Sequence, residues 1–274
     1  MMRPRKRFAQ HWLRSDAVLN KIVEAAQLSS SDRVLEIGPG QGVLTRRLFP
    51  EVKSLVAVEL DRDLCQKLVK KFGDIENFIL LQGDFLDLDV PEALNVAPEI
   101  FHHQNKVVAN IPYNITGPIL EKLLGKIAKP NPNPYDSIVL LVQKEVGDRL
   151  CAKPGSKAFG ALSVRVQYLA DCEIVCSVPR KAFYPPPKVE SAVVKLTPRN
   201  ISTPAENPKW LSTLVKVGFA NKRKMLRNNL KSLVDRDRLM EFLEKQNLEP
   251  EIRAERLSVK DWVALSNELD SIQR

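Results

Sequence analysis

The chain has 274 residues, of which 44% are hydrophobic and 27% charged, the composition of a soluble globular protein with a sizeable core. The longest apolar run near mid-chain, residues 138–142, is far too short to span a membrane, and no apolar segment of a signal peptide follows the basic amino terminus. The net charge is +9, from 27 basic and 22 acidic side chains in residues 1–198 and 15 and 11 in residues 199–274. This balance weakly favours a polyanionic partner, and we expect no contact with a membrane.

Short apolar runs alternate with helical patterns over the first two-thirds of the chain. In residues 15–28, for example, apolar side chains recur at helical spacing after a Ser-Asp start. In chain order the expected elements are a helix at 15–28, a strand at 33–38, a helix at 43–49, a strand at 54–60, a helix at 62–72, strands at 77–84 and 106–110, a helix at 118–127, and a strand at 137–146 that runs into a helix. This alternation predicts a parallel, doubly wound α/β sheet.

The pattern changes towards the carboxyl terminus. Residues 172–198 hold two β-rich runs separated by a proline cluster, which predicts an antiparallel addition at the sheet edge. The chain then becomes helical, with the expected helical segments at 210–234, 235–248 and 258–272. We therefore expect a domain boundary near residue 199, with an α/β domain over 1–198 and a small all-helical domain over 199–274.

A glycine-rich turn, Glu-Ile-Gly-Pro-Gly-Gln-Gly at 36–42, lies between the first expected strand and its helix. Gly38, Gly40 and Gly42 let the backbone turn sharply and approach a ligand closely, because no Cβ is in the way. Their Gly-x-Gly-x-Gly spacing differs from the Gly-x-Gly-x-x-Gly of dinucleotide enzymes. Alone, such a turn is weak evidence for a ligand site.

Two acidic residues strengthen the hypothesis of a ligand site. Glu59 ends the second strand, where a carboxylate can accept hydrogen bonds from ribose hydroxyls. Asp84 ends the third strand, where it can accept from an exocyclic amine such as that of adenine. Either could be a chance acid or a turn cap by itself, but both follow the glycine turn in order. Leu60 and Phe85, which adjoin these acids, belong to the same expected cofactor site.

The segment Asn-Ile-Pro-Tyr at 110–113 ends the fourth strand, and alone it indicates a proline turn capped by asparagine. Together with the preceding motifs it resembles class I S-adenosylmethionine-dependent methyltransferases, and the segment itself resembles the (Asn/Asp)-Pro-Pro-(Tyr/Phe) loop of enzymes that methylate exocyclic amines. The resemblance implies a Rossmann-like fold, S-adenosyl-L-methionine as cofactor, and a catalytic loop that Asn110 shares with the cofactor site. Catalysis would rest on orientation and electrostatics, without a metal.

The same resemblance gives each loop residue a role. The Asn110 side-chain oxygen and the Ile111 carbonyl would accept from an adenine amino group and aim it at the sulfonium methyl. Pro112 would fix the loop and present no competing donor. Tyr113 would offer a face on which the flipped base stacks.

More of the chain is similar to ribosomal RNA adenine dimethyltransferases. In that family a Gln-Asn/His-Phe-Leu segment closes over the methionine end of the cofactor. Gln10, His11 and Leu13 match this segment, and Trp12 replaces the usual phenylalanine. Phe183, in a second similar motif, would be the other stacking wall for the target adenine.

Two basic clusters fit an RNA partner, because both have the character of phosphate-facing patches. The second resembles the RNA-contacting part of the family's small domain. The residues expected to bind RNA are Arg5, Lys6, Arg7, Lys222, Arg223, Lys224 and Arg227.

The family has two branches. One dimethylates two adjacent adenines in the 3′-terminal hairpin loop of small-subunit ribosomal RNA during subunit assembly. The other modifies a large-subunit adenine and gives macrolide resistance. The motifs at 36–42, 143–150, 159–164 and 183–194 resemble the first branch, so we expect an enzyme that acts on immature small ribosomal subunits. Because the recognition motif starts by residue 5, we expect a bacterial-type cytoplasmic protein, and the lack of heptads together with the basic surface favours a monomer.

Two rival hypotheses belong to other classes. A non-catalytic RNA-binding assembly or transcription factor on this fold would have a damaged cofactor turn or target loop, whereas both are intact here. A DNA adenine methyltransferase is harder to separate, because phosphate contacts carry no sequence information. The spread of basic residues over both halves favours a large folded RNA. The four cysteines form no Cys-x-x-Cys pair, which indicates reduced thiols and no metal site.

Overall fold

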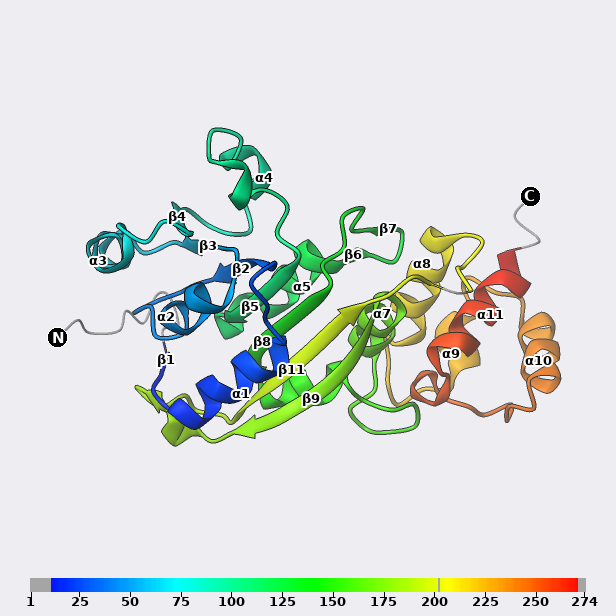
Figure 1. Cartoon of the computed structure of the whole chain (residues 1–274). Coiled ribbons are helices and arrows are strands. Elements are labelled where there is room, and N and C mark those ends of the chain that lie inside the picture. The colour runs from blue at the N-terminus through cyan, green and yellow to red at the C-terminus, as the bar shows by residue number, and fades with distance from the viewer. Residues whose placement is uncertain (1–10, 202, 271–274) are drawn as a thin grey trace. The chain divides into compact units, whose positions relative to one another are not determined.

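The computed structural model of the chain describes residues 11–201 and 203–270 (Figure 1). Its contacts divide the chain into two units. The first unit comprises residues 1–123, 133–147 and 172–198, and the second comprises residues 124–132, 148–171 and 199–274. The contacts thus group residues 148–171 with the carboxy-terminal helices, and the boundary near residue 199 stays a prediction. None of the described helices is both long and apolar enough to cross a membrane.

A seven-stranded sheet forms the centre of the first unit, in the order β4-β3-β2-β5-β8-β11-β9 (Figure 1). The first five strands in this order pair in parallel, and β11 pairs with β8 in antiparallel fashion. The bounds are β2 (Arg33–Ile37), β3 (Ser54–Glu59), β4 (Phe78–Gln82), β5 (Lys106–Asn110), β8 (Ser137–Gln143), β9 (Ala170–Val178) and β11 (Ser191–Pro198). The predicted doubly wound sheet with an antiparallel edge is confirmed.

The inner strands β2, β3, β5, β8 and β11 are largely buried, as expected where both faces of a sheet are covered, whereas the edge strands β4 and β9 are partly exposed. Side chains alternate between the faces along each strand, and in β3 all six residues are buried. On one face Leu55 and Ala57 of β3 join a core cluster with Ile22 of helix α1 (Asp16–Ala26) and Phe72 of helix α3 (Arg62–Phe72). Val56 points to the other face and is also fully buried.

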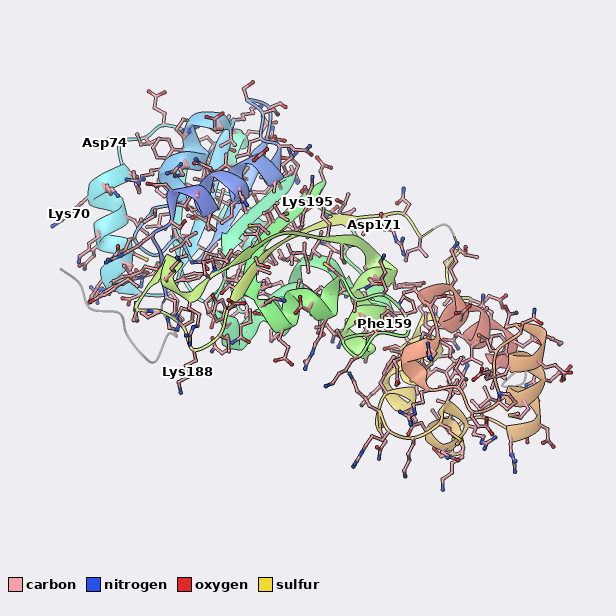
Figure 2. All side chains as sticks on the ribbon, turned by 90° about the horizontal axis from the view of Figure 1, so that it is seen from below. Lys70, Asp74, Phe159, Asp171, Lys188 and Lys195 are labelled. Atoms are coloured by element: carbon pink, nitrogen blue, oxygen red, sulfur yellow. The ribbon has the colours of Figure 1, made fainter. Side chains whose placement is uncertain are left out.

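The helices of the first unit begin where polar side chains cap them. In α1 (Asp16–Ala26) the Ser15 hydroxyl accepts from the Val18 amide, and in α3 (Arg62–Phe72) the Asp61 carboxylate accepts from the Asp63 amide. The outer side of α3 is polar, and Lys70 projects away from it (Figure 2). The remaining helices are α2 (Thr45–Leu48), α4 (Val90–Ala93), α5 (Thr116–Leu124) and short 3-10 turns at Phe49–Glu51, Glu99–Phe101, Tyr113–Ile115 and Arg180–Ala182.

Two predicted helices end earlier than expected, each for a local reason. The helix expected at 118–127 ends at Leu124, because Gly125 has φ +80° and begins the two-residue strand β6 (Gly125–Lys126), which pairs with β7 (Lys129–Pro130). The helix expected at 43–49 is α2 followed by a 3-10 turn that contains Pro50. Proline lacks the amide that would continue an α-helix.

A two-stranded ribbon fixes the segment after the amino terminus. Strand β1 (Trp12–Leu13) pairs antiparallel with β10 (Phe183–Tyr184), so that Trp12 lies opposite Tyr184 and Leu13 opposite Phe183. Residues about 170 positions apart in sequence are thereby held together.

The second unit is largely helical, as predicted for its carboxy-terminal part. Its helices are α7 (Ala161–Leu169), α8 (Pro208–Gly218), α9 (Leu226–Leu230), α10 (Arg236–Lys245), α11 (Val259–Asp270) and a 3-10 turn at Ala254–Arg256, and α6 (Lys144–Leu150) runs into this unit. The core lies around Trp262, which is fully buried and packs against Phe219 with ring centroids 5.6 Å apart.

The helical segment expected at 210–234 is interrupted. Helix α8 ends at Gly218, and Lys222, Arg223 and Lys224 lie in a turn rather than in a helix. The Asn229 side-chain amide explains the break, because it donates to the carbonyls of Gly218 at 2.6 Å and Asn221 at 3.0 Å. The Gly218 carbonyl at the end of α8 and the Asn221 carbonyl beyond it are therefore satisfied by a side chain and not by amides of a continuing helix.

Candidate active site

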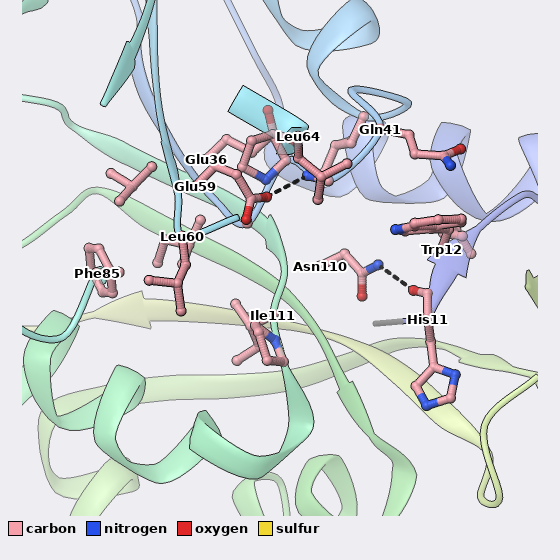
Figure 3. Close-up of a pocket in the computed structure, with 18 of the residues that line it drawn as sticks. His11, Trp12, Glu36, Gln41, Glu59, Leu60, Leu64, Phe85, Asn110 and Ile111 are labelled. Carbon is pink, nitrogen blue, oxygen red and sulfur yellow. Dashed lines mark hydrogen bonds between the residues drawn. The ribbon is translucent and has the colours of Figure 1, made fainter. Parts of the chain in front are cut away.

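An open cavity lies at the carboxyl ends of β2, β3, β4 and β5 (Figure 3). Its empty volume is about 1340 Å³, which includes space open to solvent. Strand β2 pairs with β3 on one side and β5 on the other, so the connections from β2 to β3 and from β4 to β5 lead to opposite sides of β2. Ligands of open α/β sheets bind at such a switch point.

The glycine turn forms one wall of this cavity. Gly38 and Gly40 have φ values of +68° and +59°, and the Gly38 amide donates to the Val58 carbonyl at 2.9 Å. Both glycines line the cavity. Gly42, with φ +73°, does not line it, and a Cβ there would lie 2.4 Å from the Phe72 ring. Gly42 therefore serves the packing of the turn against α3.

Glu59 is tied to the glycine turn. Its Oε2 accepts from the Gly40 amide at 3.1 Å and its Oε1 accepts from the Asp61 amide at 2.8 Å (Figure 3). The side chain is 7% exposed, and burial raises the pKa of the carboxyl despite these two bonds. Each oxygen retains a further lone pair, so Glu59 can support the turn and still accept from a ligand hydroxyl.

Glu36 lines the cavity as well, and sequence reasoning gave it no role. It is 1% exposed, and the Thr45 hydroxyl donates to its Oε2 at 2.7 Å. Burial, with a smaller contribution from the charge of Glu59, raises the pKa of Glu36 to about 8. The available signal was an acidic residue inside an otherwise apolar strand, which places a carboxyl group between the buried faces of a sheet.

The end of the cavity away from His11 and Trp12 is more apolar. Phe85 is 6% exposed, whereas Leu60 is 48% exposed at the rim (Figure 3). Asp84 also lines this end, and its Oδ1 accepts from the Leu86 amide at 2.9 Å. The structure thus brings together the two acids and the two apolar side chains that the sequence predicted to share a site.

Asn110 ends β5 and faces the middle of the cavity. Its side-chain amide nitrogen donates to the His11 carbonyl at 3.5 Å (Figure 3). Among the described residues no group donates to the side-chain oxygen. Ile111, which is 2% exposed, and Pro112 line the cavity beside it. The loop therefore presents acceptor oxygen on a backbone that a proline restrains.

Tyr113 is held from two sides. Its hydroxyl hydrogen-bonds with that of Ser191 at 2.5 Å, and its ring stacks with His11 at 6.1 Å between centroids and 20° between planes. The ring of His11 is itself fixed, because its Nδ1 lies 2.8 Å from the Pro185 carbonyl oxygen. Burial raises the pKa of Tyr113, so the hydroxyl stays protonated at neutral pH.

Some of the remaining predicted site residues line the cavity and others do not. Phe183 is 4% exposed within the core cluster and is not among the residues that line the cavity, so its stacking role stays a prediction. His11 and Leu13 do line it. In the second unit Lys222, Arg223 and Lys224 are exposed and Arg227 is partly buried. Gln10, Arg5, Lys6 and Arg7 lie outside the described residues.

Comparison with known proteins decides the family. A model of the family "Ribosomal RNA adenine dimethylase" matches residues 1–271. The chain belongs to this family. It is similar to the ribosomal RNA small subunit methyltransferase A of Trichormus variabilis, with 65% identity over 97% of this chain and 98% of that protein.

Solved structures of this kind share the fold. A dimethyladenosine transferase from Plasmodium falciparum is 28% identical, with a TM-score of 0.74 over 93% of this chain and 96% of that one. The 23S rRNA methyltransferase ErmE is 25% identical, with a TM-score of 0.73 over 94% of this chain and 99% of that one. The predicted class I methyltransferase fold is confirmed, and the chain is an S-adenosylmethionine-dependent ribosomal RNA adenine dimethyltransferase.

The residues of the cavity fit this cofactor. Two glycines with positive φ leave room beside the turn, Glu59 offers acceptors for hydroxyls, and the apolar end suits a purine ring. The cavity wall also contains the buried indole N–H of Trp12, which has no hydrogen-bond partner in the described part of the chain.

Proposed function

We propose that this enzyme dimethylates N6 of two adjacent adenines in the 3′-terminal hairpin loop of small-subunit ribosomal RNA. The 65% identity to a small-subunit methyltransferase over nearly the whole of both chains carries this proposal. The large-subunit enzyme ErmE has almost the same TM-score as the dimethyladenosine transferase but only 25% identity. The TM-score therefore does not separate the two branches, whereas sequence identity favours the branch that acts on the small subunit.

The cofactor residues act by binding and orientation. Gly38 and Gly40 give the ligand close access to the backbone, Glu59 accepts from the ribose hydroxyls, and Asp84 accepts from the adenine amine. Leu60 and Phe85 cover the adenine ring. When bound, S-adenosylmethionine supplies an electrophilic methyl group.

The loop at 110–113 acts on the target base. An adenine N6 is a poor nucleophile because its lone pair is delocalised into the ring. The Asn110 side-chain oxygen and the Ile111 carbonyl accept from the amino group and draw it out of conjugation, which is electrostatic positioning of the reacting atom. The Asn110 amide nitrogen donates to the His11 carbonyl. This hydrogen bond orients the side chain so that its oxygen is directed at the substrate.

Tyr113 supplies the stacking surface for the flipped base, with its ring fixed by Ser191 and His11. Phe183 is the proposed second wall. After transfer, the ammonium product is acidic enough to lose its proton to solvent, so no separate base is assigned.

RNA contacts come from the basic residues, because phosphate neutralisation supplies most of the affinity for RNA. We assign them to Arg5, Lys6, Arg7, Lys222, Arg223, Lys224 and Arg227, the last four in the helical domain over 199–274. We further propose that the enzyme acts as a cytoplasmic monomer on immature small ribosomal subunits.

A transfer assay tests the proposal. Purified enzyme and S-adenosylmethionine should place four methyl groups, two on each adenine, on small subunits taken from cells that lack the modification. Large subunits and a DNA duplex with adenines serve as parallel substrates. Transfer to either of these in preference to small subunits would contradict the proposal, and binding of RNA without any transfer would favour a non-catalytic assembly factor.

A further inference from the structure

The side chain of Trp12 has a buried donor that no described residue satisfies. Trp12 is 7% exposed, it lines the cavity, and its indole Nε1 makes no hydrogen bond to any residue of 11–201 or 203–270. An indole N–H is a donor only, and leaving one buried and unsatisfied is unfavourable. The indole nitrogens of Trp210 and Trp262 also lack a partner among the described residues, but neither residue lines this cavity.

Trp12 is held firmly in its place. Strand β1 pairs it with Tyr184 of β10, and its ring lies against the glycine turn. A Cβ on Gly40 would be 3.6 Å from Cδ1 and 3.7 Å from Nε1 of the indole. Figure 3 shows the nitrogen on the side of the ring that faces the cavity, at the end away from Leu60 and Phe85.

The lining of the cavity gives the second observation. The cofactor carries a carboxylate on its methionine moiety, and carboxylates in proteins are usually met by arginine, lysine or N–H donors. No arginine or lysine is among the described residues that line the cavity, and Glu36 and Glu59 are acidic. Within the described part of the cavity wall, a carboxylate therefore meets N–H donors rather than a lysine or arginine side chain.

We propose that the Trp12 indole N–H donates a hydrogen bond to the methionine carboxylate of the cofactor. This inference rests on the proposed placement of the cofactor, with adenine near Asp84 and Phe85 and ribose at Glu59. The amino-acid end of the cofactor then lies towards His11 and Trp12. Of its two charged groups only the carboxylate can accept from a donor, so the indole selects that group.

The test compares two ligands in two proteins by calorimetry. The ligands are S-adenosylhomocysteine and its decarboxylated analogue, which differ only in the carboxylate. The variant Trp12→Phe keeps an aromatic ring but removes the N–H. Its Kd for S-adenosylhomocysteine should rise by about tenfold or more, as for a lost hydrogen bond to a charged group, while its Kd for the analogue stays the same. Trp210→Phe is the matched control and should change neither value.

Nitrogen-15 NMR of the wild-type indoles gives a readout that does not depend on the variant. The Trp12 N–H proton should move downfield when S-adenosylhomocysteine binds and should move much less with the analogue. Equal weakening of both ligands in Trp12→Phe, or no weakening of either, would overturn the hydrogen bond. Failure of wild-type protein to bind either ligand would instead overturn the proposed cofactor site itself.

Discussion

Glu36 provides a sharp test of the electrostatics in the site. Its carboxyl group is 1% exposed, and the Thr45 hydroxyl donates a hydrogen bond to it. Its pKa is raised from 4.5 to about 8, so the folded protein keeps a proton that the unfolded chain releases. The stability from this proton is complete below the unfolded pKa and is lost as pH rises through the folded pKa. Between the two pKa values, each unit of pH increase lowers the contribution of Glu36 to the free energy of unfolding by up to about 1.4 kcal/mol.

The variant Glu36→Gln isolates this effect, because glutamine has the same shape and no titration. Guanidinium unfolding of both proteins should be measured at several values between about pH 5 and about pH 8. Wild-type protein should lose stability relative to Glu36→Gln as the pH rises, even though Glu59 titrates in both. If the two proteins change in parallel, Glu36 is already ionised in the fold and the reasoning is refuted.

Three further substitutions test other parts of the site. Glu59→Ala should lower stability by about 2 kcal/mol, because the Gly40 and Asp61 amides lose their acceptor, and should raise the Kd for S-adenosylhomocysteine by about tenfold or more; an unchanged Kd in calorimetry would contradict it. Asn110→Ala should lower the rate of methyl transfer by about a hundredfold or more with little change in cofactor affinity. The control Asn95→Ala, at an exposed asparagine, should change neither the rate nor the affinity. Gly42→Ala should cost about 2 kcal/mol in thermal unfolding, since its Cβ would lie 2.4 Å from the adjacent ring and its φ is positive; a neutral result would show that the turn can shift.

The sequence predicted the sheet well because its strands are continuous apolar runs. The strand expected at 106–110 is β5 with the same bounds, and α3 matches the helix expected at 62–72. Such runs carry their own signal, since a strand covered on both faces must be apolar throughout. The errors lie at helix ends, because one helix is ended by the positive φ of Gly125 and another by two hydrogen bonds from the Asn229 side chain.

The site was predictable only in part, for a related reason. Gly38, Glu59, Asp84 and Asn110 each lie at the carboxyl end of a strand, so topology alone brings them to one edge of the sheet. The pairing of Trp12 with Tyr184 depends on segments far apart in the chain, which no local pattern reveals. The proton on Glu36 depends on complete burial, which the fold determines.

The most direct measurement of the central claim is a map of methylated adenines in ribosomal RNA from cells with and without this enzyme. Mass spectrometry of nuclease fragments should find two adjacent N6,N6-dimethyladenines in the 3′-terminal hairpin loop of the small-subunit RNA. Both should be absent without the enzyme and return when it is restored, but not when Asn110→Ala is supplied instead. Unchanged small-subunit adenines together with a lost methyl group in large-subunit RNA would contradict the account.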